Sequence, residues 1–315
     1  MADRRDFLAT ASLALAGAAL APLAACGREA STASRPPKFE GTLMTRPIPS
    51  TGERLPVIGM GTSDSFEVGD DEEARVALRE VLSIFAAAGG KVVDTAPTYG
   101  SAEDVLGDLV AAQKLRERLF VATKLSGVQG RDEGFAQFEA SLRRLRTDKV
   151  DLLQVHNLQD TETQIAVARE LKAQGRARYI GLTHYREDAQ DELAAQLRKH
   201  KPDFVQINYS PVSRGFERTI LPVAKDLGIA VLINRAFDDG RLFQRVRDKP
   251  VPAWAKDVGA DSWAQLFLKF ALSPDAVTAV IPATSKPKHQ VDNLKAGVGP
   301  MLDARQRAAL VATLG

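Results

Sequence analysis

Cysteine and histidine are scarce in this sequence. Its 315 residues include one cysteine, Cys26, so an internal disulfide is impossible, and so is a cysteine-rich metal site. The four histidines are scattered, and none has the His-Glu-x-x-His spacing or a similar metal-ligand spacing. The sequence therefore favours an activity that needs no resident metal ion.

An excess of charge of one sign is also lacking. The 42 basic and 40 acidic residues give a net charge of +2, which produces no broad field to attract nucleic acid or an anionic membrane. Beyond the N-terminal region, no apolar run reaches the roughly 18 residues that a membrane-spanning helix needs. We therefore expect no nucleic-acid partner, and membrane contact only through a possible lipid anchor.

The first residues have the layout of an export signal. Arg4 and Arg5 stand before Phe-Leu, and an Ala/Leu-rich stretch runs from Ala9 to Ala21. Paired arginines before a short apolar stretch resemble a twin-arginine (Tat) signal, whose partner is the Tat export machinery. The alternative is an amphipathic helix packed on the folded domain, but this stretch is apolar on all sides.

The segment Leu23-Ala24-Ala25-Cys26-Gly27 resembles a bacterial lipobox. In such signals the cysteine becomes the lipidated first residue of the mature chain; alternatively, Cys26 is incidental and ordinary cleavage occurs nearby. We expect residues 1–26 to be a cleavable Tat-type signal peptide with a lipobox, 27–45 a flexible tether, and 46–315 one folded domain. The expected location is the periplasm, either free or anchored to the membrane through Cys26.

After the tether, short apolar runs alternate with amphipathic helical stretches. The predicted strands are Val57–Gly61, Val92–Asp94, Leu119–Thr123, Val150–His156, Tyr179–Thr183, Phe204–Asn208, Ala230–Asn234 and Val277–Ile281. The predicted helices include Glu72–Ala88, Phe135–Leu145, Gln164–Ala173, Asp188–His200 and Ser262–Leu272. Eight such units over about 250 residues fit a (β/α)8 TIM barrel of the α/β class. An open doubly wound sheet is less favoured, because no Gly-x-Gly-x-x-Gly follows the first strand.

Polar side chains end nearly every predicted strand. They are Asp94, Lys124, His156, Thr183-His184, Gln206-Asn208, Asn234-Arg235 and Thr284-Ser285-Lys286. The carboxyl ends of barrel strands carry the active site in this fold. The pattern therefore predicts an active site at that face, with Phe66 as one aromatic side chain near it.

Three of these residues, together with Tyr99, can make a proton donor. A phenol is a weak acid with a pKa of about 10, and a neighbouring ammonium lowers the pKa of a phenol. Tyr99 follows the second strand and can protonate a carbonyl oxygen that gains charge. Lys124 can supply the ammonium, and Asp94 can hold that ammonium in place. His156 can donate a hydrogen bond to the same carbonyl oxygen. Taken singly, each could be a cap, a surface charge or a packing residue, but their placement at successive strand ends favours catalysis.

These residues resemble the aldo-keto reductase superfamily. The resemblance lies in Asp94-Thr-Ala-x-x-Tyr99-Gly, the strand-terminal Lys124, and Val-Asp-Leu-Leu-Gln-Val-His ending at His156, and it extends from about Arg46 to Leu294. It implies a TIM barrel with these four residues as the catalytic tetrad and NADP(H) as cofactor. The implied reaction reduces a small aldehyde or ketone to an alcohol, or the reverse. An alternative is an NADP-binding redox sensor or scaffold with little turnover.

The resemblance also implies a site for the nicotinamide. Gln206 with Thr183 and His184 would hold its carboxamide, and Tyr209 would stack on its ring. His184 stands where many family members have asparagine, so packing is an equally open role for it.

The rest of the nucleotide is expected along the last strands. The residues concerned are Arg235, Gly240, Thr284, Ser285, Lys286, His289, Asp292 and Asn293. Pro287 suits the first turn of a helix whose free N–H groups favour phosphate, and Lys286, Lys288 and His289 add donors for a 2′-phosphate. By the resemblance, Asn293 would contact the adenine and Gly240 would let backbone approach the pyrophosphate. Arg235 or Arg241 would pair with phosphate or lie on the surface, and Lys288 could equally be solvated.

Overall fold

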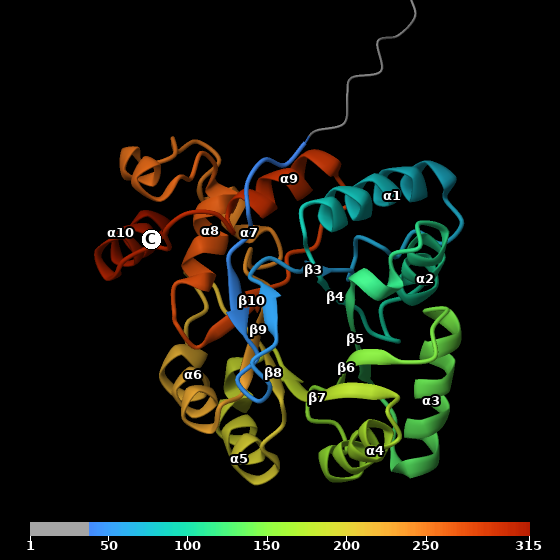
Figure 1. Ribbon diagram of the computed structural model, residues 1–315. Helices are drawn as coiled ribbons and strands as arrows, with labels where there is room; N and C mark the ends of the chain where they lie inside the picture. Colours follow the sequence, from blue (N-terminus) through green and yellow to red (C-terminus); the bar gives the residue numbers. More distant parts are fainter. Residues whose placement is uncertain (1–37) are drawn as a thin grey trace, which may run out of the picture. The chain divides into compact units, whose positions relative to one another are not determined.

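Eight parallel strands form a barrel in the computed structural model, which describes residues 38–315 (Figure 1). The strands are β3 Met60–Gly61, β4 Val92–Asp94, β5 Phe120–Leu125, β6 Val150–His156, β7 Ala177–His184, β8 Phe204–Asn208, β9 Ala230–Asn234 and β10 Val277–Val280. Each pairs with the next along the chain, and the bridges Ile58↔Val280 and Gly61↔Ala283 join the last strand to the first. The predicted TIM barrel is confirmed, whereas the predicted signal peptide lies outside the described residues.

Helices surround these strands (Figure 1). They are α1 Glu72–Ala87, α2 Ala102–Ala112, α3 Gly130–Arg144, α4 Thr161–Ala173, α5 Gln190–His200, α6 Phe216–Leu227, α7 Arg241–Arg245, α8 Trp263–Leu272, α9 Pro287–Lys295 and α10 Ala304–Leu314, with 3-10 turns Arg116–Arg118, Glu187–Ala189 and Ala253–Val258. Helix α1 begins at Asp71, whose carboxylate accepts the Ala74 N–H at 3.0 Å, and α8 begins at Ser262 in the same way. None of the described helices is long and apolar enough to cross a bilayer.

A β-hairpin that the strand pattern does not predict precedes the barrel. It pairs β1 Thr45–Pro47 with β2 Arg54–Pro56, and its residues Ile48 and Leu55 are completely buried. Leu43, assigned to the tether from composition, is only 7% exposed. The chain is therefore already packed against the core at residue 43, within the range expected for the tether.

The interior of the barrel changes from apolar to polar along each strand. Side chains two residues apart share a face of a strand, so Phe120, Ala122 and Lys124 of β5 all point inward. Phe120 and Ala122 belong to the buried apolar cluster inside the barrel, as does Phe204 of β8, two residues before Gln206. The same inward face thus supplies a packed floor and, one layer nearer the carboxyl end, polar groups.

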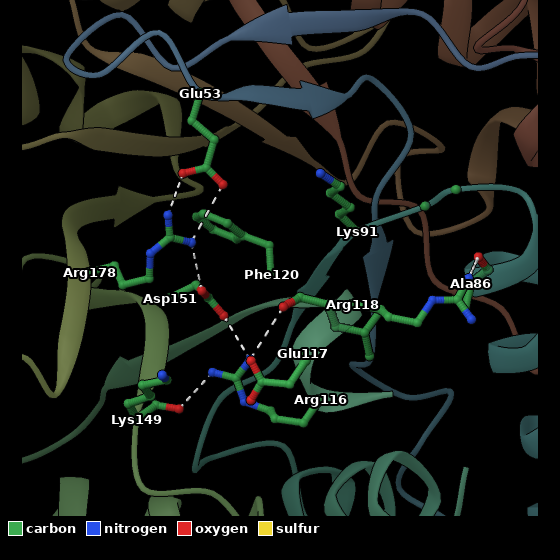
Figure 2. Close-up of a pocket in the computed structure, with 13 residues that line it drawn as sticks. Glu53, Ala86, Lys91, Arg116, Glu117, Arg118, Phe120, Lys149, Asp151 and Arg178 are labelled. Carbon is green, nitrogen blue, oxygen red and sulfur yellow. Dashed lines mark hydrogen bonds and ion pairs between the residues drawn. The ribbon is translucent and has the colours of Figure 1, made fainter. Parts of the chain in front are cut away.

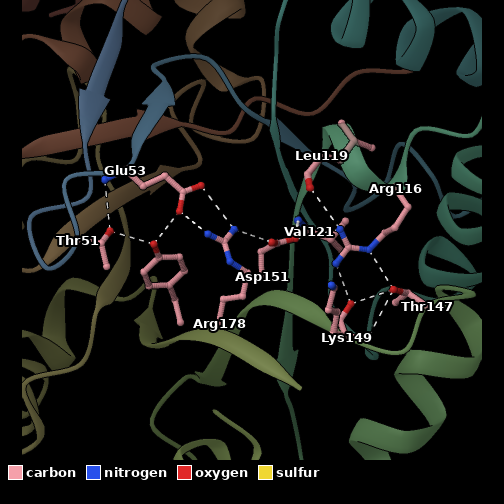
Figure 3. A network of polar contacts seen from close by, with 10 residues as sticks. Thr51, Glu53, Arg116, Leu119, Val121, Thr147, Lys149, Asp151 and Arg178 are labelled. Atoms are coloured by element: carbon pink, nitrogen blue, oxygen red, sulfur yellow. Dashed lines mark hydrogen bonds and ion pairs between the residues drawn. The ribbon is translucent and has the colours of Figure 1, made fainter. Parts of the chain in front are cut away.

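An ion-pair network covers the amino end of the barrel, beside a cleft of about 480 Å³ (Figures 2 and 3). Asp151 at the start of β6 accepts the Val121 N–H at 2.9 Å. It also pairs with Arg178 at 2.9 Å and with Arg116 at 3.1 Å, and Arg178 bonds Glu53 beside the hairpin. These contacts join three strand starts to the hairpin, which is a stabilising role for this end of the barrel.

Candidate active site

A buried ion pair lies at the carboxyl end of the barrel. Lys124 of β5 is 0% exposed, and its Nζ lies 2.7 Å from Asp94 Oδ2 and 2.8 Å from the Thr95 carbonyl oxygen. The other carboxylate oxygen of Asp94 accepts hydrogen bonds from Gln154 Nε2 at 3.0 Å and Gln206 Nε2 at 2.8 Å. Both oxygens of Asp94 are therefore satisfied, and the lysine is held in one place.

Burial and the surrounding charges act in opposite directions on the pKa of Lys124. Burial disfavours the ammonium and lowers its pKa, while the Asp94 carboxylate and the Tyr99 phenol raise it. The raising effects win, so the pKa of Lys124 lies above its usual value. Lys124 consequently carries its positive charge at neutral pH.

Tyr99 lies between this ammonium and a histidine. Its ring is half-buried in the turn that follows β4, and the ring centre is 4.9 Å from Lys124 Nζ. The rings of Tyr99 and His156 meet edge to face, with centres 6.2 Å apart and planes at 82°. The structure thus brings together Asp94, Tyr99, Lys124 and His156, the four residues predicted to act together.

His156 ends β6 and is a neutral imidazole. Its Nδ1 lies 2.6 Å from Ser126 Oγ, the residue just after β5. Burial, followed by the positive charge of Lys124 and the nearby His184, lowers the pKa of His156 to about 3. At neutral pH the ring therefore carries a single N–H.

A cleft of about 740 Å³ opens above these groups. The predicted residues that line it are Asp94, Tyr99, His156, Thr183, Gln206, Arg235, Gly240, Thr284, Ser285, Lys286 and His289. They come from the ends of six strands and the loops that follow. Lys124 lies behind them, where it touches Asp94 but not the cleft.

Tyr209 is not where the resemblance implies. The expected ring for stacking on a nicotinamide is 0% exposed and lies against Phe270, with ring centres 5.5 Å apart. Its hydroxyl is hydrogen-bonded by Arg307 of α10. This side chain packs between β8 and the helices outside the barrel, so the expectation that it faces the cleft is wrong.

Three further expected cofactor residues do not line the cleft. Asp292 of α9 accepts hydrogen bonds from Ser262 Oγ at 2.7 Å and Gln265 Nε2 at 2.6 Å, so its carboxylate joins α9 to α8. Asn293 is 2% exposed and does not line the cleft. His184 accepts the Arg186 N–H at 3.1 Å through Nδ1, which is the packing alternative for this residue.

Two other expectations concern side chains near the cleft. Phe66 is completely buried in the core beneath the loop after β3, so it is not available to a substrate. Arg235 does line the cleft, but it already pairs with Asp239, and its guanidinium lies 4.8 Å from the centre of the Tyr185 ring. Arg241 pairs with Asp238 at 2.8 Å and does not line the cleft.

Three residues join the site that the strand-end pattern does not name. They are Gln154, which bonds Asp94; Ser126, which bonds His156; and Tyr185, which lines the cleft. Asn234, which the pattern does name, also lines the cleft. The sequence could have predicted that Gln154 faces the site, because it lies two residues before His156 and so shares the same inward face of the strand. It could not have predicted the role of Ser126, because a serine after a strand is common in loops.

The described residues contain no group of three or more histidine, cysteine or acidic side chains placed to hold a metal ion. The cleft is lined by phenol, ammonium, imidazole and amide groups.

Comparison with known proteins places this site in a family. The sequence profile of the aldo/keto reductase family matches residues 57–313. The aldo-keto reductase YhdN of Bacillus subtilis is 28% identical over 219 residues, which are 64% of this chain and 64% of that protein. The NADH-specific methylglyoxal reductase of Escherichia coli is 27% identical over 244 residues, 67% of this chain and 72% of that protein.

A solved structure gives the same result. An aldo/keto reductase from Klebsiella pneumoniae, in complex with NADP and acetate, superposes with a TM-score of 0.67 and 26% identity, over 82% of this chain and 91% of that one. The family profile covers most of the barrel, including all four residues gathered around Tyr99. This chain belongs to the aldo/keto reductase family.

Proposed function

We propose that this protein is an NADPH-dependent reductase that converts a small aldehyde or ketone to the alcohol, with Tyr99 as the general acid. The observation that carries the proposal is the position of Tyr99 in the cleft, beside His156 and against the buried ammonium of Lys124. A scaffold or a sensor has no need of a charged lysine buried beneath a phenol. The family membership supports the same reaction class.

The cleft fits a nicotinamide nucleotide. Asn234 lines the cleft, and its Oδ1 has no hydrogen-bond partner among residues 38–315, so this amide can accept from a carboxamide N–H. Gly240 directly precedes α7 and has a φ of +82°. No atom lies within 4 Å of the place that a Cβ would take, so a pyrophosphate can approach the backbone there. When bound, the reduced nucleotide supplies a hydride to the carbonyl carbon.

The choice of NADPH over NADH rests on Lys286. Its side chain is exposed and lines the cleft at the start of α9, and His289 lies one turn later. An ammonium beside free helix N–H groups favours a phosphate monoester, which only NADPH carries at its ribose. One relative above is NADH-specific and another was crystallised with NADP. The nucleotide preference proposed for this chain therefore depends on its own residues.

Each polar residue around Tyr99 then has a task in proton transfer. Tyr99 gives its phenolic proton to the carbonyl oxygen as charge develops there. Lys124 stabilises the phenolate that remains, and Asp94 keeps the ammonium in position. His156, neutral at working pH, donates a hydrogen bond to the same oxygen and orients the carbonyl.

The residues around the expected carbonyl position favour a small polar substrate. Ser63 and Ser65 follow β3 and line the cleft near Tyr99, and Asn157 lines it next to His156. Asn157 Oδ1 has no hydrogen-bond partner in the described part of the chain, so the amide of this lining residue can bind a substrate hydroxyl. With Phe66 in the core, the loop after β3 contributes hydroxyl groups rather than an aromatic side chain to the cleft.

The test is consumption of NADPH with a panel of carbonyl compounds. Short hydroxylated aldehydes should be reduced with a higher kcat/KM than benzaldehydes, with one alcohol formed per NADPH oxidised. Tight binding of NADPH without turnover of any compound would contradict a reductase and support the sensor or scaffold. A parallel series with NADH measures the nucleotide preference.

We propose further that the protein is exported and tethered outside the cytoplasm. The support is the Arg4-Arg5 pair, the apolar stretch to Ala21 and the lipobox-like position of Cys26. The Tat route moves folded proteins, and a bound nucleotide stabilises the folded state, so the barrel can acquire NADP(H) before export. Replacing both arginines, Arg4→Lys with Arg5→Lys, should retain active enzyme in the cytoplasm, and Cys26→Ala should prevent membrane attachment. Unchanged fractionation of both variants would contradict the proposal.

A further inference from the structure

Ser126 holds His156, the histidine beside Tyr99 in the cleft. Its hydroxyl oxygen lies 2.6 Å from Nδ1 of His156, and the serine itself is only 3% exposed. The contact joins the residue after β5 to the last residue of β6, two neighbouring strands of the barrel. Nδ1 is thereby occupied, so Nε2 is the nitrogen left for a ligand in the cleft.

The position of Ser126 does not depend on its own hydroxyl. Its backbone N–H donates to Gln137 Oε1 at 2.7 Å, and Gln137 Nε2 donates to its carbonyl oxygen at 2.7 Å. The next N–H, of Gly127, donates to Gln159 Oε1 at 2.7 Å. Helix α3 and the loop after β6 therefore clamp this backbone, and removal of the hydroxyl leaves the clamp in place.

The tautomer of His156 follows from the hydrogen-bonding capacity of the serine. The His156 ring carries one N–H, because burial keeps its pKa at about 3. Either Nδ1–H donates to the serine oxygen, or the serine O–H donates to a bare Nδ1. In residues 38–315 the hydroxyl of Ser126 has no other hydrogen-bond partner. The first arrangement would leave a buried O–H without an acceptor, which is unfavourable, so the second is preferred.

We propose that Ser126 is a positioning residue that fixes His156 as the Nε2–H tautomer and so makes it a hydrogen-bond donor toward the carbonyl oxygen beside Tyr99. The use of that donor rests on the proposed reductase function, whereas the tautomer does not. With the proton on Nδ1 instead, the Nε2 lone pair would face the carbonyl oxygen and repel it. A single serine hydroxyl thus decides whether the imidazole attracts or repels the substrate.

The tautomer can be measured without substrate. In protein labelled with ¹⁵N-histidine, the ring ¹⁵N shifts distinguish Nε2–H from Nδ1–H, and the His156→Gln spectrum assigns the signal. The wild-type protein at pH 7 should show the Nε2–H form alone. Ser126→Ala should show a mixture or the Nδ1–H form, and Ser126→Thr, which keeps the hydroxyl, should restore Nε2–H. A wild-type Nδ1–H signal, or an unchanged signal in Ser126→Ala, would overturn the proposal.

Kinetics then test the consequence in the same variants. Ser126→Ala should lower kcat by about tenfold or more, since a carbonyl-oxygen donor is weakened, while the NADPH Kd stays within twofold. Ser126→Thr should recover most of the rate. Ser210→Ala is the matched control, because Ser210 is 1% exposed after β8 and its hydroxyl bonds only nearby backbone N–H groups. A changed tautomer with unchanged kcat would overturn the donor role. If the wild-type protein reduces nothing, the proposed function fails, and the NMR result still decides the tautomer.

Discussion

Lys124 and Asp94 form a buried ion pair, with Nζ and Oδ2 2.7 Å apart and side-chain exposures of 0% and 3%. Charges buried in this way are costly unless they remain paired. The Lys124 ammonium lies 4.9 Å from the centre of the Tyr99 ring, so the buried pair places a cation next to a phenol.

Lys124→Met should therefore cost both stability and activity. The variant leaves the Asp94 carboxylate buried without its cation, and we expect unfolding free energy to fall by about 3–5 kcal/mol, measured by urea titration. The double variant Lys124→Met with Asp94→Asn removes both charges and should regain much of that stability while remaining inactive. If the double variant is as unstable as the single one, the charge account is wrong.

The pH dependence of stability should carry a contribution from His156. In the unfolded chain this histidine titrates near 6.5, whereas in the folded protein burial holds its pKa at about 3. The unfolded state therefore binds more protons between these values, so the contribution is present above pH 6.5 and is lost as the pH falls toward 3. His156→Gln should show a shallower loss of unfolding free energy between pH 7 and pH 4. Equal slopes in the two proteins would contradict the low pKa.

Lys286→Ala should weaken NADPH binding and leave NADH binding unchanged. Loss of one charged hydrogen bond to the 2′-phosphate should raise the NADPH Kd about tenfold, measured by fluorescence titration. Lys288→Ala is the control, because this lysine is two residues along α9 but does not line the cleft. Equal losses for both nucleotides would place Lys286 away from the 2′-phosphate.

Asp151→Asn tests the division of roles between the two ends of the barrel. Asp151 is 5% exposed and pairs with Arg178 and Arg116 at the amino end. The amide keeps the shape but removes the charge, so we expect a loss of about 1–3 kcal/mol in unfolding free energy. The kcat should stay within twofold, because the network lies at the opposite end from Tyr99. A large fall in kcat with unchanged stability would show that this end takes part in catalysis.

The barrel could be predicted from sequence because its strands are short apolar runs separated by amphipathic helices. The observed β6, β8 and β9 have the predicted limits, since each is bounded by clear turn residues. The hairpin at Thr45–Pro56 was missed, because its three-residue strands are too short to show a period. The hairpin residues Ile48 and Leu55 are buried against inward side chains of the barrel strands, and these come together only when the barrel has folded.

Site residues could be predicted from the sequence where the end of a strand fixes their position, and could not be predicted elsewhere. Tyr99, Lys124 and His156 follow from strand ends, because a barrel brings the ends of parallel strands to one face. Tyr209 and Asp292 could not be placed this way, since each lies beyond or outside a strand, where the facing helix decides its direction. Ser126 depends on a cross-strand contact with His156 that strand limits alone do not define.

Tyr99→Phe tests the central claim most directly, because it removes one oxygen and keeps the ring between Lys124 and His156. The measurement is single-turnover oxidation of NADPH by the wild-type protein and the variant, with a small hydroxylated aldehyde in excess, together with the NADPH Kd of each. We predict that the rate falls by at least ~10²-fold while the Kd stays within twofold. A variant that oxidises NADPH at close to the wild-type rate would show that the proton comes from another group.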